Sequence, residues 1–150
     1  MSKRSILEII LVEDNDFDAE LTIRALQEGR ISNPIFRITD GQELLDFLFP
    51  PDSPNDSLII APPRLILLDL KLPRIDGLEV LKVIKSDTRT KWIPVVVLTS
   101  STEETDMIKS YHLGVNSYIV KPVDFDNFTA TVKQLGLYWV LLNQIPTKSK

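Results

Sequence analysis

The chain has 150 residues, 43% of them hydrophobic and 25% charged, and its formal net charge is -4. These values predict one globular domain over residues 1–150 and exclude a disordered or fibrous chain. The absence of cysteine excludes disulfides and thiol chemistry, and the single histidine argues against His-rich metal sites and a Ser-His-Asp triad. The negative charge argues against binding to nucleic acid. The lack of a signal peptide or a long apolar run predicts no membrane segment and a cytoplasmic location.

Short apolar runs and helical patterns alternate along the chain. The predicted strands are Ile6 to Val12, Pro34 to Ile38, Arg64 to Leu68, Pro94 to Leu98 and Ser117 to Val120. The predicted helices run from the acidic segment after the first strand to Gly29, from Asp40 to Phe49, from Asp76 through Ile84, from Glu103 to His112 and from about Asp124 to Leu142. Strands separated by such helices pair in parallel through right-handed crossovers. The predicted fold is therefore α/β, a doubly wound five-stranded parallel sheet with helices on both faces.

The first and last helical patterns also indicate caps and buried faces. In the first, Phe17, Leu21 and Ala25 share one apolar face. Either Asp14 or Asp16 can cap the start of that helix. In the last, apolar residues at alternating spacings predict one stripe that packs on the sheet. Its members are Phe125, Phe128, Val132, Leu135, Trp139 and Leu142.

Polar residues follow four of the predicted strands, where the ligand site of a doubly wound sheet lies. They are Glu13 with Asp14, Asp69, Thr99 with Ser100, and Lys121 with Pro122. Three carboxylates at one edge repel each other, and a hard divalent cation such as Mg²⁺ relieves that repulsion. A metal, a lysine and a hydroxyl around one carboxylate form a phosphoryl-transfer site, with Asp69 as the nucleophile. Each residue alone also fits a cap, a turn or a solvated surface, but their coincidence at four strand ends favours the site.

Four segments in chain order resemble the receiver domain of two-component response regulators. They are Glu13-Asp14-Asn15, Asp69 to Pro73 with Asp76-Gly77, Thr99-Ser100 and Ser117 to Pro122. The resemblance covers a core of about residues 6–142. It implies a flavodoxin-like (βα)5 fold with the strand order 2-1-3-4-5.

The resemblance also implies a role for each site residue. Asp69 is the phosphoacceptor, and it binds Mg²⁺ together with Glu13, Asp14 and the backbone carbonyl of Lys71. Lys121 is the counter-ion of the phosphoryl group, and the Lys121-Pro122 peptide bond is cis. Thr99 and Tyr118 form a conformational switch, and Lys71 and Ser101 flank the path of attacking water and tune the phosphoryl lifetime.

The implied function is signalling rather than metabolism. A sensor histidine kinase donates the phosphoryl group, and the chain catalyses its own phosphorylation and dephosphorylation without being a conventional turnover enzyme. Only residues 143–150 follow the last helix, so no DNA-binding module is expected. The signal therefore passes by protein contact or by onward transfer to a phosphotransfer protein.

A Pro-rich insertion, Pro50 to Pro63, and an aromatic tail resemble the single-domain regulators that partner bacterial phytochromes. The insertion contains Leu58-Ile59-Ile60, which a solvated loop does not normally expose. These residues either cover the edge of the sheet beside the third strand, which is slightly favoured, or contact the kinase.

The last helical pattern contains a second set of apolar residues, which would be exposed to water unless another surface packs against them. This set begins only after Gly136, where a bend or break is expected because glycine disfavours helix interiors. Its members are Leu137, Tyr138, Val140, Leu141 and Ile145. The remaining tail is too short to fold back over them. The pattern therefore predicts a homodimer through the fourth helix, fifth strand and last helix, either constitutive or strengthened by phosphorylation.

Three other functions fit the residues less well. A haloacid-dehalogenase hydrolase also uses an aspartate nucleophile, but it needs a second aspartate where this chain has Lys71. A pseudo-receiver without chemistry does not need the complete acidic set and Lys121. A nucleotide-binding Rossmann domain needs a Gly-rich turn after the first strand, which this chain lacks.

Overall fold

The computed structural model describes residues 9–28, 34–50, 63–100 and 117–136. Its strands are β1 (Ile9–Val12), β2 (Ile35–Ile38), β3 (Leu65–Asp69), β4 (Val95–Thr99) and β5 (Ser117–Val120). Its helices are α1 (Asp16–Glu28), α2 (Gly41–Leu48), α3 (Gly77–Ser86) and α5 (Phe125–Gln134). The predicted helix Glu103 to His112 and most of the Pro-rich insertion lie outside the described residues. In the described part of the chain, no helix is long and apolar enough to cross a membrane.

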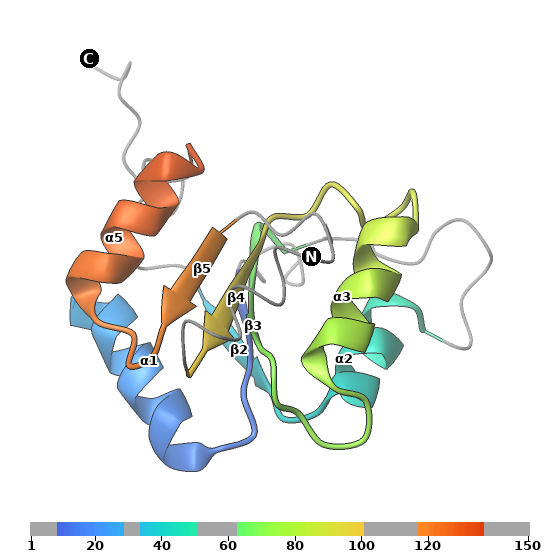
Figure 1. The fold of residues 1–150 in the computed structure, drawn as a ribbon, viewed down its shortest axis with the longest axis horizontal. Helices are drawn as coiled ribbons and strands as arrows, with labels where there is room; N and C mark the ends of the chain where they lie inside the picture. Colours follow the sequence, from blue (N-terminus) through green and yellow to red (C-terminus); the bar gives the residue numbers. More distant parts are fainter. Residues whose placement is uncertain (1–8, 29–33, 51–62, 101–116, 137–150) are drawn as a thin grey trace, which may run out of the picture.

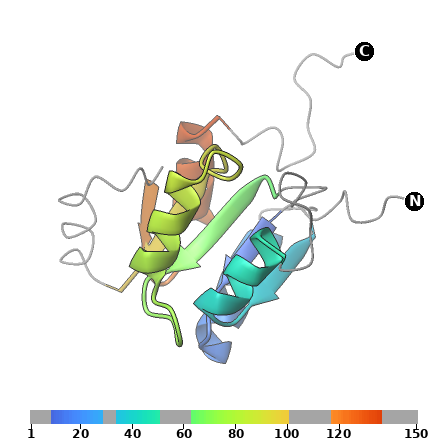
Figure 2. The same ribbon diagram turned by 90° about the vertical axis from the view of Figure 1, so that its right-hand side faces the viewer.

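The strands form one parallel sheet in the order β2-β1-β3-β4-β5. Helices α1 and α5 cover one face of this sheet, and α2 and α3 cover the other (Figure 1). Seen from the side, α2 and α3 lie in one layer in front of the strands (Figure 2). The predicted doubly wound sheet and its strand order are therefore confirmed.

Two apolar cores lie on opposite faces of the sheet because successive strand residues point to opposite sides. Strands β1, β3 and β4 are buried at every position. In β1, Ile9 and Leu11 join the core under α1 and α5, which includes Leu26 and Phe128. Ile10 and Val12 join the core under α2 and α3. Burial on both faces explains why these strands read as continuous apolar runs in the sequence.

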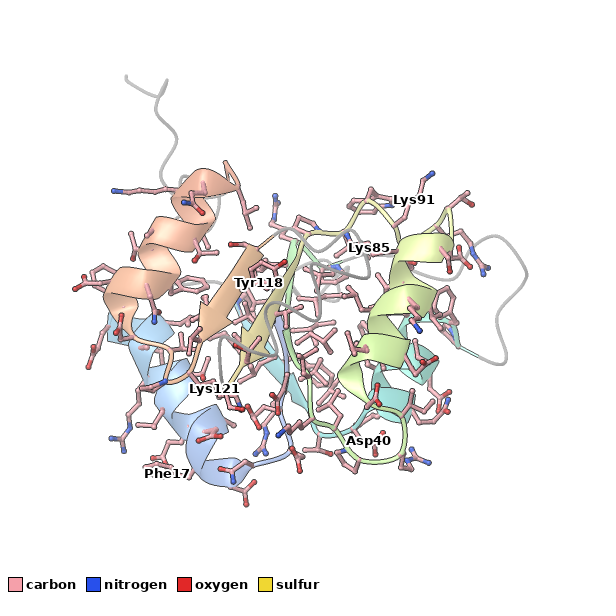
Figure 3. All side chains as sticks on the ribbon, in the orientation of Figure 1. Phe17, Asp40, Lys85, Lys91, Tyr118 and Lys121 are labelled. Atoms are coloured by element: carbon pink, nitrogen blue, oxygen red, sulfur yellow. The ribbon has the colours of Figure 1, made fainter. Side chains whose placement is uncertain are left out.

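The start of α1 differs from the prediction in its cap and in its buried face. The side-chain Oδ1 of Asn15 accepts a 2.8 Å hydrogen bond from the backbone N–H of Asp18, so Asn15 is the cap rather than Asp14 or Asp16. Phe17 is 67% exposed and does not share the buried face with Ala25. Figure 3 shows Phe17 at the start of α1, at the lower end of that helix.

The end of α5 also differs from the prediction of a helix continuing to Leu142. The helix ends at Gln134, Leu135 is its C-cap, and Gly136 has a φ of 74°. The expected break at Gly136 is therefore present, since a left-handed backbone ends a helix. Along the predicted stripe, Phe128 and Val132 are buried and Leu135 packs against them, whereas Phe125 is 38% exposed. The rest of the stripe lies outside the described residues.

Candidate functional site

Three acidic side chains meet at the carboxyl ends of β1 and β3. Glu13 and Asp14 follow β1, and Asp69 is the last residue of β3. Ligand oxygens of the three carboxylates lie within 4.8 Å of one another. Glu13 and Asp69 are buried, at 1% and 5% exposed, whereas Asp14 is exposed. Pairing of β1 with β3 in register produces this meeting, because it brings the two strand ends to the same level.

Lys121 reaches this cluster from the end of β5. Its Nζ lies 2.9 Å from Oε1 of Glu13 and 3.2 Å from Oδ1 of Asp69. The Lys121–Pro122 peptide is cis, and the backbone N–H of Lys121 donates a 2.7 Å hydrogen bond to the carbonyl of Thr99. Figure 3 shows Lys121 between β5 and the start of α1. The structure thus brings together the residues expected at the first, third and fifth strand ends.

A fourth carboxylate, that of Asp18, also binds Lys121. Its Oδ2 accepts a 3.2 Å hydrogen bond from Nζ of Lys121. Asp18 was not among the site residues predicted from the sequence. An acidic residue in the first turn of a helix is ordinarily explained by the helix dipole, so no local pattern marked it as part of the site. Only the packing of α1 beside β5 reveals this contact.

The surroundings of Asp69 and Lys121 raise the pKa values of both groups. Burial and the nearby negative charge of Glu13 raise the pKa of Asp69 to about 7, against the opposing effect of Lys121. Burial alone would lower the pKa of Lys121, but hydrogen bonding to Glu13 and the charges of Asp69 and Glu13 raise it. Lys121 is therefore fully charged at neutral pH, whereas Asp69 lies close to its midpoint when no cation is bound.

Arg37 of β2 holds the loop that carries two of the carboxylates. Its Nε donates a 3.0 Å hydrogen bond to the backbone carbonyl of Glu13, and its Nη1 lies 2.9 Å from Oδ1 of Asp16. Within the same loop, the backbone N–H of Asn15 donates to Oε2 of Glu13. These contacts attach the start of α1 to the edge strand and orient the Glu13 carboxylate.

The loop after β3 forms the wall of a cavity of about 650 Å³ beside the cluster. The lining residues are Asp14, Leu70, Lys71, Leu72, Pro73, Asp76 and Leu78. Gly77 closes this loop, because its backbone N–H donates a 2.8 Å hydrogen bond to the carbonyl of Leu70. A Cβ at Gly77 would clash with the backbone of Asp69 and Leu70. Asp14 is the member of the acidic cluster that lines this cavity.

The remaining predicted site residues are only partly described. Thr99 is fully buried at the end of β4, and Ser100 is exposed. Tyr118 is half-buried and packs against the core on the α2 and α3 side. Ser101 and the predicted dimer residues Leu137, Tyr138, Val140, Leu141 and Ile145 lie outside the described residues.

The donor set fits a hard divalent cation. Glu13, Asp14 and Asp69 offer only carboxylate oxygens, which are the ligands that Mg²⁺ and Mn²⁺ accept. Burial and then repulsion by Glu13 raise the pKa of Asp69, and a bound cation would relieve the repulsion. Lys121 neutralises only part of the negative charge, since it faces three carboxylates itself.

Comparison with known proteins identifies the family. The response regulator receiver domain family matches residues 9–133. A probable methanogenesis regulatory protein, FilR2 of Methanothrix harundinacea, is 42% identical over 92% of this chain and 86% of its own length. The response regulator Rcp1 of Synechocystis is 38% identical over 92% of both chains.

Solved structures give the same assignment and add a metal-bound relative. The bacteriophytochrome response regulator AtBRR superposes with a TM-score of 0.81 at 45% identity, covering 93% of this chain and 99% of its own. The Mn²⁺-bound form of Rcp1 superposes with a TM-score of 0.65 at 39% identity, covering 87% and 92% of the two chains. The acidic cluster at the strand ends, Lys121 and these likenesses together show that the chain belongs to the response regulator receiver domain family.

Proposed function

We propose that this protein is a cytoplasmic signalling protein that accepts a phosphoryl group on Asp69 from a sensor histidine kinase in a Mg²⁺-dependent reaction. The observation that carries the proposal is the position of Asp69. It is a buried carboxylate at a strand end, beside Glu13 and Asp14 and within 3.2 Å of the Lys121 ammonium. Those are the parts that phosphoryl transfer to a carboxylate needs.

The residues divide the work of the transfer. An Asp69 oxygen forms the bond to phosphorus while the bond from phosphorus to the donor imidazole nitrogen breaks, and the electron pair leaves with the imidazole. Lys121 places a positive charge where the phosphoryl oxygens arrive. Glu13, Asp14, Asp69 and the backbone carbonyl of Lys71 would hold Mg²⁺, which when bound neutralises charge on the moving phosphoryl group. The chain catalyses this step and its own later dephosphorylation, in which a water oxygen bonds to phosphorus, the bond to the Asp69 oxygen breaks and inorganic phosphate leaves. It is not a conventional turnover enzyme.

Phosphorylation is proposed to change the surface around β5. Thr99 is buried at the end of β4, and Tyr118 is half-buried on β5, which pairs with β4. Movement of the Thr99 hydroxyl toward a phosphoryl oxygen would leave space into which the Tyr118 ring can turn. The changed surface then contacts a protein target or a phosphotransfer protein, and Lys71 and Ser101 set how long the change lasts.

A kinase of the phytochrome type is the proposed donor. Support comes from AtBRR, which is described as a bacteriophytochrome response regulator, at 45% identity. The Mn²⁺-bound form of Rcp1 supports the divalent cation in the same way. The FilR2 relative, at 42% identity, is described as a probable methanogenesis regulatory protein, not as a phytochrome partner. Incubation of this protein with a purified, phosphorylated phytochrome kinase therefore tests the donor directly.

The test of the proposed function is intact mass after incubation with Mg²⁺ and acetyl phosphate. We expect a single phosphoryl adduct that disappears in Asp69→Asn and after removal of Mg²⁺. The matched control is Asp46→Asn, which removes the charge of an exposed carboxylate bonded to Gln42 on α2 and should keep the adduct. An adduct that persists in Asp69→Asn, or steady hydrolysis of small phosphoesters, would contradict the proposal.

A further inference from the structure

We propose that Asp18 is a positioning residue for phosphoryl transfer. Its carboxylate holds the Lys121 ammonium at a point between the start of α1 and Asp69. This inference rests on the proposed function, because it concerns how Lys121 is presented to the incoming phosphoryl group. It deepens that function by assigning a role to a carboxylate outside the cluster of three.

The first step is the arrangement around the Lys121 ammonium. Nζ lies 2.9 Å from Glu13, 3.2 Å from Asp18 and 3.2 Å from Asp69. An ammonium has three N–H donors. Two of them donate hydrogen bonds to Glu13 and Asp18, and the Asp69 carboxylate lies within ion-pair distance of the same nitrogen. An arriving phosphoryl oxygen therefore meets an ammonium that already has three carboxylate neighbours.

The second step is that Asp18 differs from the other two partners. Glu13 and Asp69 belong to the group that can hold a divalent cation, whereas Asp18 does not. Asp18 is 37% exposed, and Glu13 and Asp69 are buried. A cation bound by Glu13 and Asp69 weakens their attraction for Lys121. The contact with Asp18 is then the one that keeps the ammonium beside the site.

The third step is that Asp18 is itself held in place. Its backbone N–H donates a 2.8 Å hydrogen bond to Oδ1 of the cap Asn15. The cap follows directly after Glu13 and Asp14, and Arg37 attaches this loop to β2. The backbone of Asp18 is therefore fixed relative to the acidic cluster, as the backbone of a positioning residue must be.

The expected effect is a slower transfer in the absence of the Asp18 charge. In the reaction with acetyl phosphate, an Asp69 oxygen bonds to phosphorus while the bond from phosphorus to the acetate oxygen breaks, and acetate leaves with the electron pair. Asp18→Asn should lower the rate of adduct formation roughly three- to tenfold, the effect of a half-exposed ion pair on a barrier. The midpoint of thermal unfolding should change little, because an asparagine keeps the shape of the side chain.

The experiment measures the rate of adduct formation by intact mass in saturating Mg²⁺ for the wild type and five variants, including Asp18→Asn, Lys121→Gln and their combination. Asp18→Glu should restore most of the rate, because it returns the carboxylate. Glu20→Gln is the matched control: it removes one charge from the same helix at a residue paired with Arg24, and it should keep the wild-type rate. In a Lys121→Gln background, Asp18→Asn should have no further effect, because Asp18 acts through the ammonium.

The outcomes separate this inference from the proposed function. If Asp18→Asn forms the adduct at the wild-type rate, the role of Asp18 is overturned and the proposed function still stands. An equal slowing by Asp18→Asn in the presence and absence of Lys121 would also overturn that role. Wild-type protein that forms no adduct at all would overturn the proposed function instead.

Discussion

Asp69 combines burial with the negative charge of Glu13, and this combination links the stability of the protein to pH. In the folded chain without a cation, its pKa is about 7, against an ordinary value of 3.8. Between these pH values the folded state keeps a proton that the unfolded chain has released. The free energy of unfolding therefore falls as the pH rises from about 4 to about 7. The proposed phosphoryl-acceptor site is thus a source of instability in the protein without a bound cation.

A first prediction concerns Asp69→Asn, which removes this titration. In EDTA, the free energy of unfolding of the wild type should fall by ~1–3 kcal/mol between pH 5 and pH 8 because of this group. The variant should show a smaller fall and should be the more stable protein at pH 8. Urea unfolding at the two pH values measures both quantities. Equal slopes for the variant and the wild type would contradict the assignment, and Asp46→Asn is the control.

A second prediction at the residue scale concerns Gly77. Its position has no room for a Cβ, which would meet the backbone of Asp69 and Leu70. Gly77→Ala should destabilise the protein by about 1–3 kcal/mol, the usual effect of overpacking, and should slow phosphorylation by displacing the Asp69 backbone. Gly136→Ala is a useful contrast because its Cβ meets nothing within 4 Å. It tests the φ of 74° alone, and it should leave phosphorylation unchanged.

At the scale of elements, the edge strand β2 is coupled to the site through Arg37. This strand contributes little to the core, since only Ile38 is buried. Its functional contribution is the guanidinium, which binds the Glu13 carbonyl and the Asp16 carboxylate. One nitrogen, Nη2, is buried without a hydrogen-bond partner among the described residues. A buried polar atom without a partner lowers the stability of the folded state, and its presence is consistent with a role of Arg37 in holding the loop.

A third prediction tests this coupling with Arg37→Met, which keeps the apolar part of the side chain and removes the guanidinium group. The loop from Glu13 to Asp16 should lose its attachment to β2, so the increase in melting temperature on adding Mg²⁺ should become smaller. Arg37→Lys should not restore it, because an ammonium does not reproduce the two-directional contact. Arg24→Met, on the exposed face of α1, is the control. An unchanged Mg²⁺ effect in Arg37→Met would show that the loop is held by other contacts.

At the scale of the whole molecule, the face around β5 is one of the places where the described residues expose apolar side chains. Val120 is 42% exposed and Phe125 is 38% exposed, and β5 is an edge of the described sheet. Exposed apolar side chains on a sheet edge mark a surface for association. The proposed homodimer uses this face together with the apolar residues after Gly136.

A fourth prediction is that the protein forms this dimer in solution. Sedimentation of the wild type should show a dimer, and Leu137→Asp combined with Leu141→Asp should convert it to a folded monomer by placing charges in an apolar interface. Each protein is measured with and without beryllofluoride, which distinguishes a constitutive dimer from one strengthened by activation. A wild type that is monomeric at high micromolar concentration in both states would refute the dimer. A double variant that still dimerises would place the interface elsewhere.

The sequence by itself determined the order of strands and helices and the residues delivered to the site. Apolar periodicity is a local signal, and the strand-end position of Glu13, Asp69 and Lys121 follows from chain order in a parallel sheet. The break of the last helix at Gly136 could also be predicted from the sequence, because glycine readily adopts a positive φ.

Only the tertiary structure decided which side chains share the site and which face of a helix is covered. The contact of Lys121 with Asp18 joins residues 103 positions apart and depends on how α1 packs beside β5. The exposure of Phe17 depends on which side of α1 the folded chain covers, and the anchoring of the acidic loop depends on Arg37 of a neighbouring strand. The physical reason is the same in each case. Periodicity and caps act over a few residues, whereas burial and charge pairing depend on side chains that only the folded chain brings together.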